Sequence, residues 1–137
     1  MPRSRHPIDG QVFLMAGAKA SVTLPALSAL LARAQRYVRD RRETYEQRYE
    51  RVVGPGGRCY SLAEKHHWEE VGETLDLPER EANALRRVHA AQFRRAGRRL
   101  DRFEEFETTL EIRDVVAFGP EENDAEGTEF REPGPAN

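Results

Sequence analysis

The longest regular pattern of hydrophobic positions runs from residue 25 to residue 52. Apolar side chains recur there three, four or seven residues apart, as on one face of a helix. Pro25 suits a first helical turn, and the Gly-Pro-Gly-Gly sequence at 54–57 would end the helix. We therefore predict one long amphipathic helix over 25–52. Its apolar stripe consists of Leu27, Leu31, Ala34, Val38, Tyr45, Tyr49 and Val52.

Two short segments before this helix are rich in residues that favour strands. They are Gln-Val-Phe-Leu-Met at 11–15 and Ser-Val-Thr-Leu at 21–24, and Gly17 lies near the middle of the sequence between them. We therefore predict a small N-terminal β-hairpin. Residues 1–10 contain two prolines and no periodicity, so we predict an irregular lead-in there.

Two more helices are predicted further along, on either side of a tight turn. Trp68, Val71 and Leu75 share one face of a short first helix. Asp76 then interrupts the pattern, and Pro78 suits the first turn of the second helix. The positions that the second helix is expected to bury are Ala82, Leu85, His89, Phe93 and Ala96.

Residues 100–118 fit two patterns. Leu100, Phe103 and Leu110 continue a helical stripe, whereas the sequence Thr-Leu-Glu-Ile-Arg-Asp-Val-Val-Ala-Phe at 109–118 is also typical of a strand. We predict a helix to about residue 109 and then an extended end, and both helix and strand stay open for 109–118.

Together these elements predict a mainly α fold in a single domain over residues 11–118. The length of 137 residues suits one domain with a modest core. Hydrophobic residues make up 38% and charged residues 34% of the chain, against usual values of roughly 45–50% and about 25%. Thin amphipathic elements are therefore expected. Residues 119–137 are rich in Pro, Gly and acids, and we predict a disordered acidic tail there.

Opposite charges are segregated along the chain, although the net charge is only −2. The net charge is +6 for residues 1–62, −4 for 63–77, +5 for 78–102 and −9 for 103–137. Arg outnumbers Lys by 20 to 2, and the planar guanidinium suits phosphate and carboxylate groups. A basic body with an acidic arm is typical of polyanion binding or of a masked basic surface. Solvated helix faces of opposite sign are the alternative explanation.

A pattern of small and apolar residues occupies positions 70–87. A small residue lets two helices approach, two leucines bracket the turn, and two apolar residues pack the second helix on the first. These positions are Gly72, Leu75, Leu77, Ala82 and Leu85. The segment resembles the helix-turn-helix family of DNA-binding transcription regulators, which implies such a motif within residues 68–99. At the turn the family prefers Gly, whereas this chain has Asp76, a residue type that also tolerates unusual backbone angles.

The resemblance implies that the outward face of the second helix enters the major groove of double-stranded DNA. That face would present Glu79, Arg80, Asn83, Ala84 and Arg87. Arg80, Asn83 and Arg87 are expected to contact bases, because Arg and Asn can bond guanine and adenine edges through two hydrogen bonds. Contacts to phosphate are expected from Arg94, Arg95, Arg98 and Arg99. Glu79 and Glu81 oppose this reading, since acids repel phosphate.

Such regulators gain affinity by placing two recognition helices about 34 Å apart, so we also predict a homodimer through the helix at 25–52. The alternative is a helical protein–protein interaction module that binds no nucleic acid. For the arginines near residue 95, the alternative to phosphate contact is a solvated helix face paired with acids of the segment 101–111, either in the same chain or in another.

No catalytic, cofactor or metal signature stands out. The Gly-Pro-Gly-Gly sequence is not followed by the Gly-Lys-Ser/Thr ending of a phosphate-binding loop. Cys59, His66 and His67 match no zinc spacing, and adjacent histidines on a helix point in different directions. We expect His66 and His67 at the solvated start of a helix, and Trp68 and His89 packed in the core. A non-enzymatic protein without cofactor or metal is therefore predicted.

The remaining features concern the environment of the chain. A single cysteine cannot form an internal disulfide, and no apolar run is long enough for a signal core or a membrane span. We therefore expect a cytoplasmic protein that does not contact membranes. The Arg-rich, Lys-poor composition with an acidic tail resembles small proteins of halophilic archaea, which implies a cytoplasm of high salt. The near-neutral net charge departs from that pattern.

Overall fold

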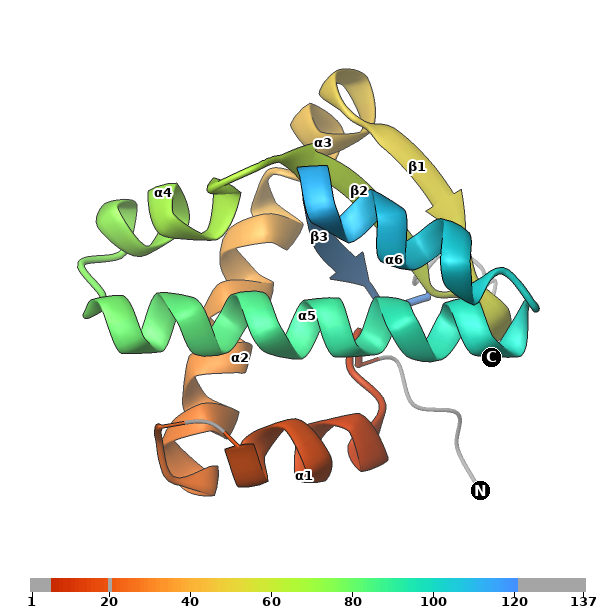
Figure 1. Ribbon diagram of the computed structural model, residues 1–137. Helices are drawn as coiled ribbons and strands as arrows, with labels where there is room; N and C mark the ends of the chain where they lie inside the picture. Colours follow the sequence, from red (N-terminus) through yellow and green to blue (C-terminus); the bar gives the residue numbers. More distant parts are fainter. Residues whose placement is uncertain (1–5, 20, 121–137) are drawn as a thin grey trace, which may run out of the picture.

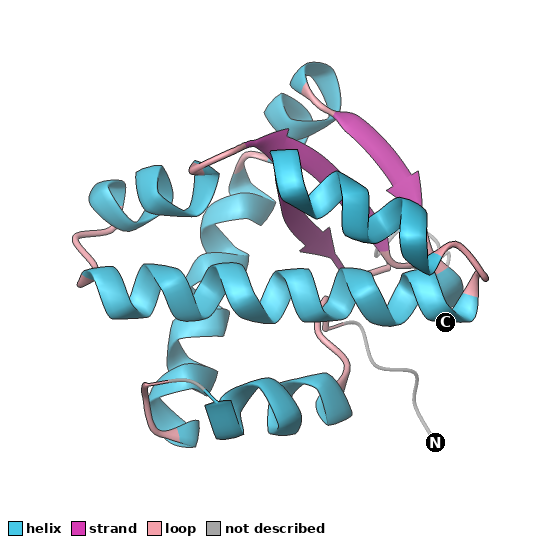
Figure 2. Ribbon diagram, in the orientation of Figure 1, coloured by secondary structure: helices cyan, strands magenta, loops and turns pink. Residues whose placement is uncertain are grey.

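The computed structural model describes residues 6–19 and 21–120, which form a mainly helical protein with one small sheet (Figures 1 and 2). The elements are α1 (Gly10–Lys19), α2 (Leu24–Asp40), α3 (Arg42–Arg48), β1 (Glu50–Val53), the 3-10 helix η1 (Pro55–Gly57), β2 (Cys59–Glu64), α4 (His67–Thr74), α5 (Glu79–Arg99), α6 (Phe103–Ile112) and β3 (Arg113–Phe118). The three strands form an antiparallel sheet in the order β1-β2-β3. The mainly α class predicted from the sequence is confirmed, and the sheet is an unpredicted addition to it.

Helix α5 is the centre of the fold. It crosses the molecule with α1 along one side and α6 and the sheet along the other (Figure 1), and it contacts α1, α2, α4, α6 and β3. Acids in its first turn and Arg98 and Arg99 in its last turn complement the helix dipole. Its 21 residues make it about 30 Å long at a rise of about 1.5 Å per residue.

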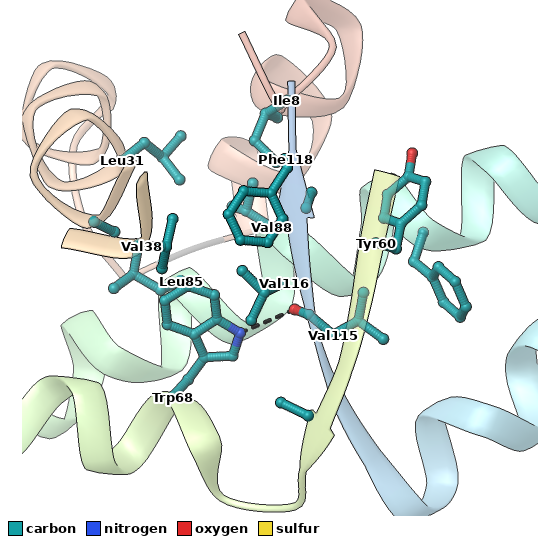
Figure 3. Packing of buried hydrophobic residues seen from close by; sticks show 14 of the residues in the cluster. Ile8, Leu31, Val38, Tyr60, Trp68, Leu85, Val88, Val115, Val116 and Phe118 are labelled. Atoms are coloured by element: carbon teal, nitrogen blue, oxygen red, sulfur yellow. Dashed lines mark hydrogen bonds between the residues drawn. The ribbon is translucent and has the colours of Figure 1, made fainter. Parts of the chain in front are cut away.

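The hydrophobic core lies where α2, α4 and α5 meet the sheet, and Ile8 and Val12 extend it toward α1 (Figure 3). Trp68 is 1% exposed, and its indole Nε1 donates a hydrogen bond of 3.0 Å to the Val115 carbonyl oxygen, which ties α4 to β3 (Figure 3). Val116 pairs with Ser61 in the central strand, and both residues are buried. The predicted core roles of Trp68 and His89 are confirmed, since both side chains are buried and their rings stack.

The predicted N-terminal hairpin is wrong, because residues 10–19 form helix α1 and Thr23 caps the start of α2. The buried positions Val12 and Gly17 do not alternate with exposed ones as in a strand, and Leu, Met and Ala favour helices. Gly17 does not form a turn, and its lack of a side chain allows α1 to pack closely against α2. A Cβ atom there would lie 2.5 Å from Cδ2 of Leu24.

The predicted single helix over 25–52 is also wrong, since it is divided into α2, α3 and β1. The break falls at Arg41, whose φ of −114° and ψ of 18° interrupt the helix. Further on, Val52 pairs with Tyr60 in the β1–β2 ladder. A strand gains hydrogen bonds from β2 that a free helix end would not make, and it keeps Val52 half-buried.

The C-terminal part follows the predicted change from helix to extended chain. Helix α6 continues to Ile112, a few residues beyond the expected end at about 109, and β3 then pairs with β2. Of the predicted tail, Gly119 and Pro120 have no regular structure, and residues 121–137 lie outside the described residues, as do residues 1–5 of the lead-in. Within the part of the chain that the structure describes, no helix is long and apolar enough to cross a membrane.

Candidate functional site

The corner between α4 and α5 has the close approach that the sequence pattern predicts. A Cβ atom on Gly72 would lie only 2.8 Å from Cβ of Ala82, so the two helices touch where glycine leaves room. The Leu77 amide donates to the Gly72 carbonyl oxygen at 2.7 Å, and Asp76 takes a left-handed conformation with φ of 59°. The turn therefore uses Asp76 in a backbone conformation that usually favours glycine.

The residues expected to read bases lie only partly on an open surface. Arg80 and Arg87 are exposed, whereas Asn83 is half-buried and its Oδ1 accepts a hydrogen bond from Arg86. Ala84, which was expected on the outward face, is 2% exposed and belongs to the core face of α5. The structure therefore leaves two arginines of this set available to a partner.

Exposed carboxylates are also present on α4, in the turn and at the start of α5. Five carboxylates of the corner are exposed, against three arginines between positions 79 and 87. The carboxylates belong to Glu69, Glu70, Glu73, Asp76 and Glu79. Glu69 and Glu79 line one hollow together with Asn83 and Arg86, and these two carboxylates would repel a DNA phosphate that approached there.

The arginines expected to contact phosphate fall into two pairs. Arg94 and Arg95 already have partners within the chain: Nε of Arg94 lies 2.6 Å from Oε2 of Glu107, and Nε of Arg95 lies 3.3 Å from Oδ2 of Asp9. Arg95 Nε is buried and makes no hydrogen bond of good geometry. Arg98 and Arg99 are exposed, and the Arg98 guanidinium carbon lies 5.2 Å from the Phe103 ring centroid.

The outward face of α5 nevertheless forms one continuous surface, which we call the α5 stripe. Its members are seven, four, three and four residues apart, so they share a single helix face about 27 Å long. The half-exposed Ala91 lies in the middle and is small. The α5 stripe consists of Arg80, Arg87, Ala91, Arg94 and Arg98. Ala91 was not expected on this face from the sequence, although the seven-residue spacing of Arg80, Arg87 and Arg94 indicates it.

Helix α6 lies beside α5 (Figure 1) and carries four glutamates between positions 104 and 111. Glu104, Glu105 and Glu111 are exposed, and Glu107 reaches Arg94. The ion pair between Arg94 and Glu107 has side chains 39% and 37% exposed, and pairs so accessible to water contribute only about 0–1 kcal/mol. Arg94 can therefore exchange Glu107 for another carboxylate at little cost.

The histidines lie in different environments. His66 is exposed, but His67, which was expected at a solvated helix start, is buried, and its Nε2 lies 2.7 Å from the Tyr45 hydroxyl. Nδ1 of His89 accepts a hydrogen bond of 3.0 Å from the Ala117 amide, and burial lowers the pKa of His89 to about 3. Among residues 6–19 and 21–120, no cluster of three or more His, Cys, Asp or Glu is arranged to hold a metal.

The structure defines a mainly helical protein built around one long central helix and a three-stranded sheet. A family model described as a domain of unknown function (DUF8048) matches residues 6–120, and the chain belongs to this family. The match covers every helix and strand from α1 to β3, so the family corresponds to the whole fold. No curated protein and no solved structure matches the chain.

Proposed function

We propose that the protein is a non-enzymatic protein-interaction module that binds an acidic segment of a partner protein along the α5 stripe. The observation that carries this proposal is the row of exposed and half-exposed arginines on one face of α5, in which Arg94 already pairs with the α6 carboxylate of Glu107. Ala91 lies between Arg87 and Arg94, so a partner helix can approach the backbone of α5 at that point.

A surface of mixed sign favours a protein over DNA. The phosphates of DNA are all negative, so phosphate at the stripe would compete with Glu107 for Arg94 and would be repelled by Glu79 near Arg86. A protein partner can place acids against Arg80, Arg87 and Arg98 and basic or neutral residues against the flanking glutamates. Such complementarity fixes orientation and excludes wrong partners more than it adds raw affinity.

DNA binding of the helix-turn-helix type is the second candidate, and the geometry of the α4–α5 corner favours it. The close contact of Gly72 with Ala82 and the tight turn at Asp76 are what the resemblance implies. In this case Arg80, Asn83 and Arg87 would contact bases. Phosphates would be contacted by Arg94, Arg95, Arg98 and Arg99.

The second candidate needs changes that the first does not. Arg95 would have to leave Asp9, with which it forms a partly buried pair, whereas the more exposed pair of Arg94 with Glu107 is exchanged at little cost for either partner. The homodimer expected through residues 25–52 would also need another surface than the tyrosine stripe, because Tyr45 is 4% exposed and packs inside the chain. These requirements rank DNA binding below a protein partner.

The experiment uses two charge-reversal variants of the full chain expressed in its own cells. The stripe variant is Arg87→Glu with Arg98→Glu, and the matched control is Arg36→Glu with Arg39→Glu on the exposed face of α2. After cross-linking and nuclease treatment, one protein should be recovered in stoichiometric amount with wild type and with the control, and it should be lost with the stripe variant.

The same preparations decide between the candidates. Genomic fragments are selected on the wild-type protein at the salt concentration of the cell. Enrichment of a defined sequence that Arg80→Ala or Asn83→Ala weakens by about 1–3 kcal/mol would establish DNA binding and overturn the protein proposal. Equal losses of the partner with the stripe and control variants would also overturn it.

A further inference from the structure

A cavity of about 190 Å³ opens between the α2–α3 break and helix α4, on a different part of the molecule from the α5 stripe. Tyr37 and Arg41 at the end of α2, Arg48 and Tyr49 at the end of α3, and His67 from α4 contribute to its lining. The break at Arg41 turns α3 out of the line of α2. The feature that the sequence pattern does not predict therefore creates the cavity.

The floor of the cavity is buried and can form hydrogen bonds. Tyr45 is 4% exposed and His67 is 8% exposed, and the Tyr45 hydroxyl lies 2.7 Å from Nε2 of His67. Burial raises the pKa of Tyr45 and lowers the pKa of His67, so both groups are neutral near pH 7. The floor offers a hydroxyl and ring surfaces without a charge. It suits the uncharged part of a ligand.

The mouth of the cavity is aromatic and mainly basic. The Arg41 guanidinium carbon lies 3.7 Å from the Tyr37 ring centroid, and its NH1 donates to the Tyr37 carbonyl oxygen at 2.9 Å. These contacts hold Arg41 in place, and a guanidinium has five N–H donors, so others remain for a ligand. Arg48 lies 5.5 Å from the Tyr49 ring centroid. Its contact with Glu64 is long, at 3.4 Å between two exposed side chains, and is easily exchanged.

We propose that this cavity binds a small aromatic carboxylate. The ring of the ligand lies against the tyrosines over the uncharged floor, and its carboxylate accepts hydrogen bonds from Arg41 and Arg48 at the mouth. The size fits: a cavity of about 150 Å³ accommodates benzene, and 190 Å³ leaves room for one carboxylate substituent. Two guanidiniums against the single carboxylate of Glu70 among the lining residues make the mouth favour an anion.

Other ligand classes fit less well. Inorganic phosphate would use the arginines but leave the aromatic walls and the floor empty. A nucleotide is larger than the cavity. A neutral aromatic molecule would fill the ring site but would leave the two guanidiniums without a new acceptor.

The test is a titration of the full chain, labelled with ¹⁵N, with sodium benzoate, benzamide and inorganic phosphate. Benzoate should shift the amide signals of Thr44, Tyr45 and Val71, which belong to the lining. Benzamide has the same shape without the charge and should bind about tenfold more weakly, because its neutral carbonyl accepts weaker hydrogen bonds from the guanidiniums than a carboxylate does. Phosphate should leave these signals in place.

Variants distinguish the site from general attraction of anions. Arg41→Gln and Arg48→Gln each change an exposed side chain, and each should lower the affinity for benzoate by about tenfold. Arg36→Gln removes the same charge from α2 outside the cavity lining and should change the affinity less than twofold. If circular dichroism shows that Arg41→Gln does not fold, the proposal is tested by the comparison of Arg48→Gln with Arg36→Gln. Unchanged signals at about 10 mM benzoate, equal binding of benzamide, or an equal loss with Arg36→Gln would overturn the proposal.

Discussion

The α4–α5 corner and the α2–α3 break are both places where one helix ends and another begins, but they are set in different ways. At the corner, Gly72, Asp76 and Pro78 supply a close approach, a left-handed turn and a helix start within seven residues. At the break, Arg41 lies among ordinary helix formers, with neither glycine nor proline nearby. The first is encoded by neighbours in the sequence, and the second depends on distant contacts.

The distant contacts at the break can be named. Tyr45 on α3 lies 2.7 Å from Nε2 of His67, and its ring centroid is 5.6 Å from that of Phe118 on β3. Four residues after α3 ends, Val52 pairs with Tyr60. A straight helix through Arg41 would carry Tyr45 away from these partners. Tertiary packing therefore overrides helix propensity at this position.

The largest expected effect is at Trp68, which joins the two regions. Its ring stacks on His89 at 4.4 Å and meets the His67 ring edge-on at 5.5 Å between centroids. Trp68→Ala should lower the free energy of unfolding by about 3–5 kcal/mol, because a large buried side chain is lost and a cavity remains. Urea unfolding followed by circular dichroism measures this. A loss below about 1 kcal/mol would show that the two regions do not share a core.

Next in size is the test of the corner itself. Gly72→Ala should cost about 1–3 kcal/mol, since the new Cβ atom would overlap Ala82. Adding Ala82→Gly should recover much of the loss, which a double-mutant cycle measures. Gly10→Ala is the matched control: no atom lies within 4 Å of its added Cβ, so no loss is expected. Absence of coupling between positions 72 and 82 would contradict the close approach.

Acid should weaken the protein through its buried histidines. Burial lowers the pKa of His89 to about 3, whereas the unfolded value is about 6.5. The stabilising contribution is therefore complete above pH 6.5, and it decreases as the pH falls toward 3 because only the unfolded chain binds the proton. The free energy of unfolding should decrease by about 1.4 kcal/mol per pH unit between pH 6 and pH 4.5. Burial shifts the pKa of His67 in the same direction and adds to the slope.

Variants assign this pH dependence to the two regions. Urea titrations at several pH values should give a smaller slope for His89→Gln, between Trp68 and β3, and for His67→Gln, beside the cavity. His66→Gln should keep the wild-type slope, because that side chain is exposed. An unchanged slope in His89→Gln would mean that other groups cause the acid sensitivity.

The hydrogen bond between Tyr45 and His67, beside the α2–α3 break, is expected to contribute less to the free energy of unfolding than the corner does. Tyr45→Phe removes the hydroxyl that bonds His67 and leaves a buried ring nitrogen without this partner, at a cost of about 1–2 kcal/mol. Tyr37→Phe, at the half-buried edge of the same cavity, should cost less than about 0.5 kcal/mol. Thermal unfolding of both variants measures the difference. Equal effects would show that the bond between Tyr45 and His67 does not stabilise the break.

The smallest expected effects come from placing glycine at Asp76 in the corner and at Arg41 in the break, and they should have opposite signs. Asp76→Gly should raise the free energy of unfolding by about 0.5–1 kcal/mol, because glycine adopts a φ of 59° without a side-chain clash. Arg41→Gly should lower it by about the same amount, since a φ of −114° needs no glycine and the unfolded chain gains freedom. Chemical denaturation of the two variants measures both signs. Stabilisation by Arg41→Gly would show that the break is strained locally.

The sequence by itself determined the elements whose causes are local. Helical spacing and the Gly72, Asp76 and Pro78 positions predict α4, the turn and α5, and the buried face of α5 follows the expected stripe from Ala82 to Ala96. The change from helix to extended chain near residue 110 is predicted as well. For the candidate site, the sequence identified the arginines of α5 that the structure places along one face.

The tertiary structure decided what depends on partners far along the chain. Whether residues 50–53 are helix or strand depends on β2, and whether residues 11–19 are strand or helix depends on their contacts with α2 and α5. Two of the predicted phosphate-binding arginines pair with Glu107 and Asp9; the sequence offered acids of 101–111 as alternative partners, but it gave no indication of Asp9. The cavity beside Arg41 likewise exists only because α3 and α4 meet. Short-range patterns report the intrinsic preference of a segment, and burial against the rest of the fold can exceed that preference.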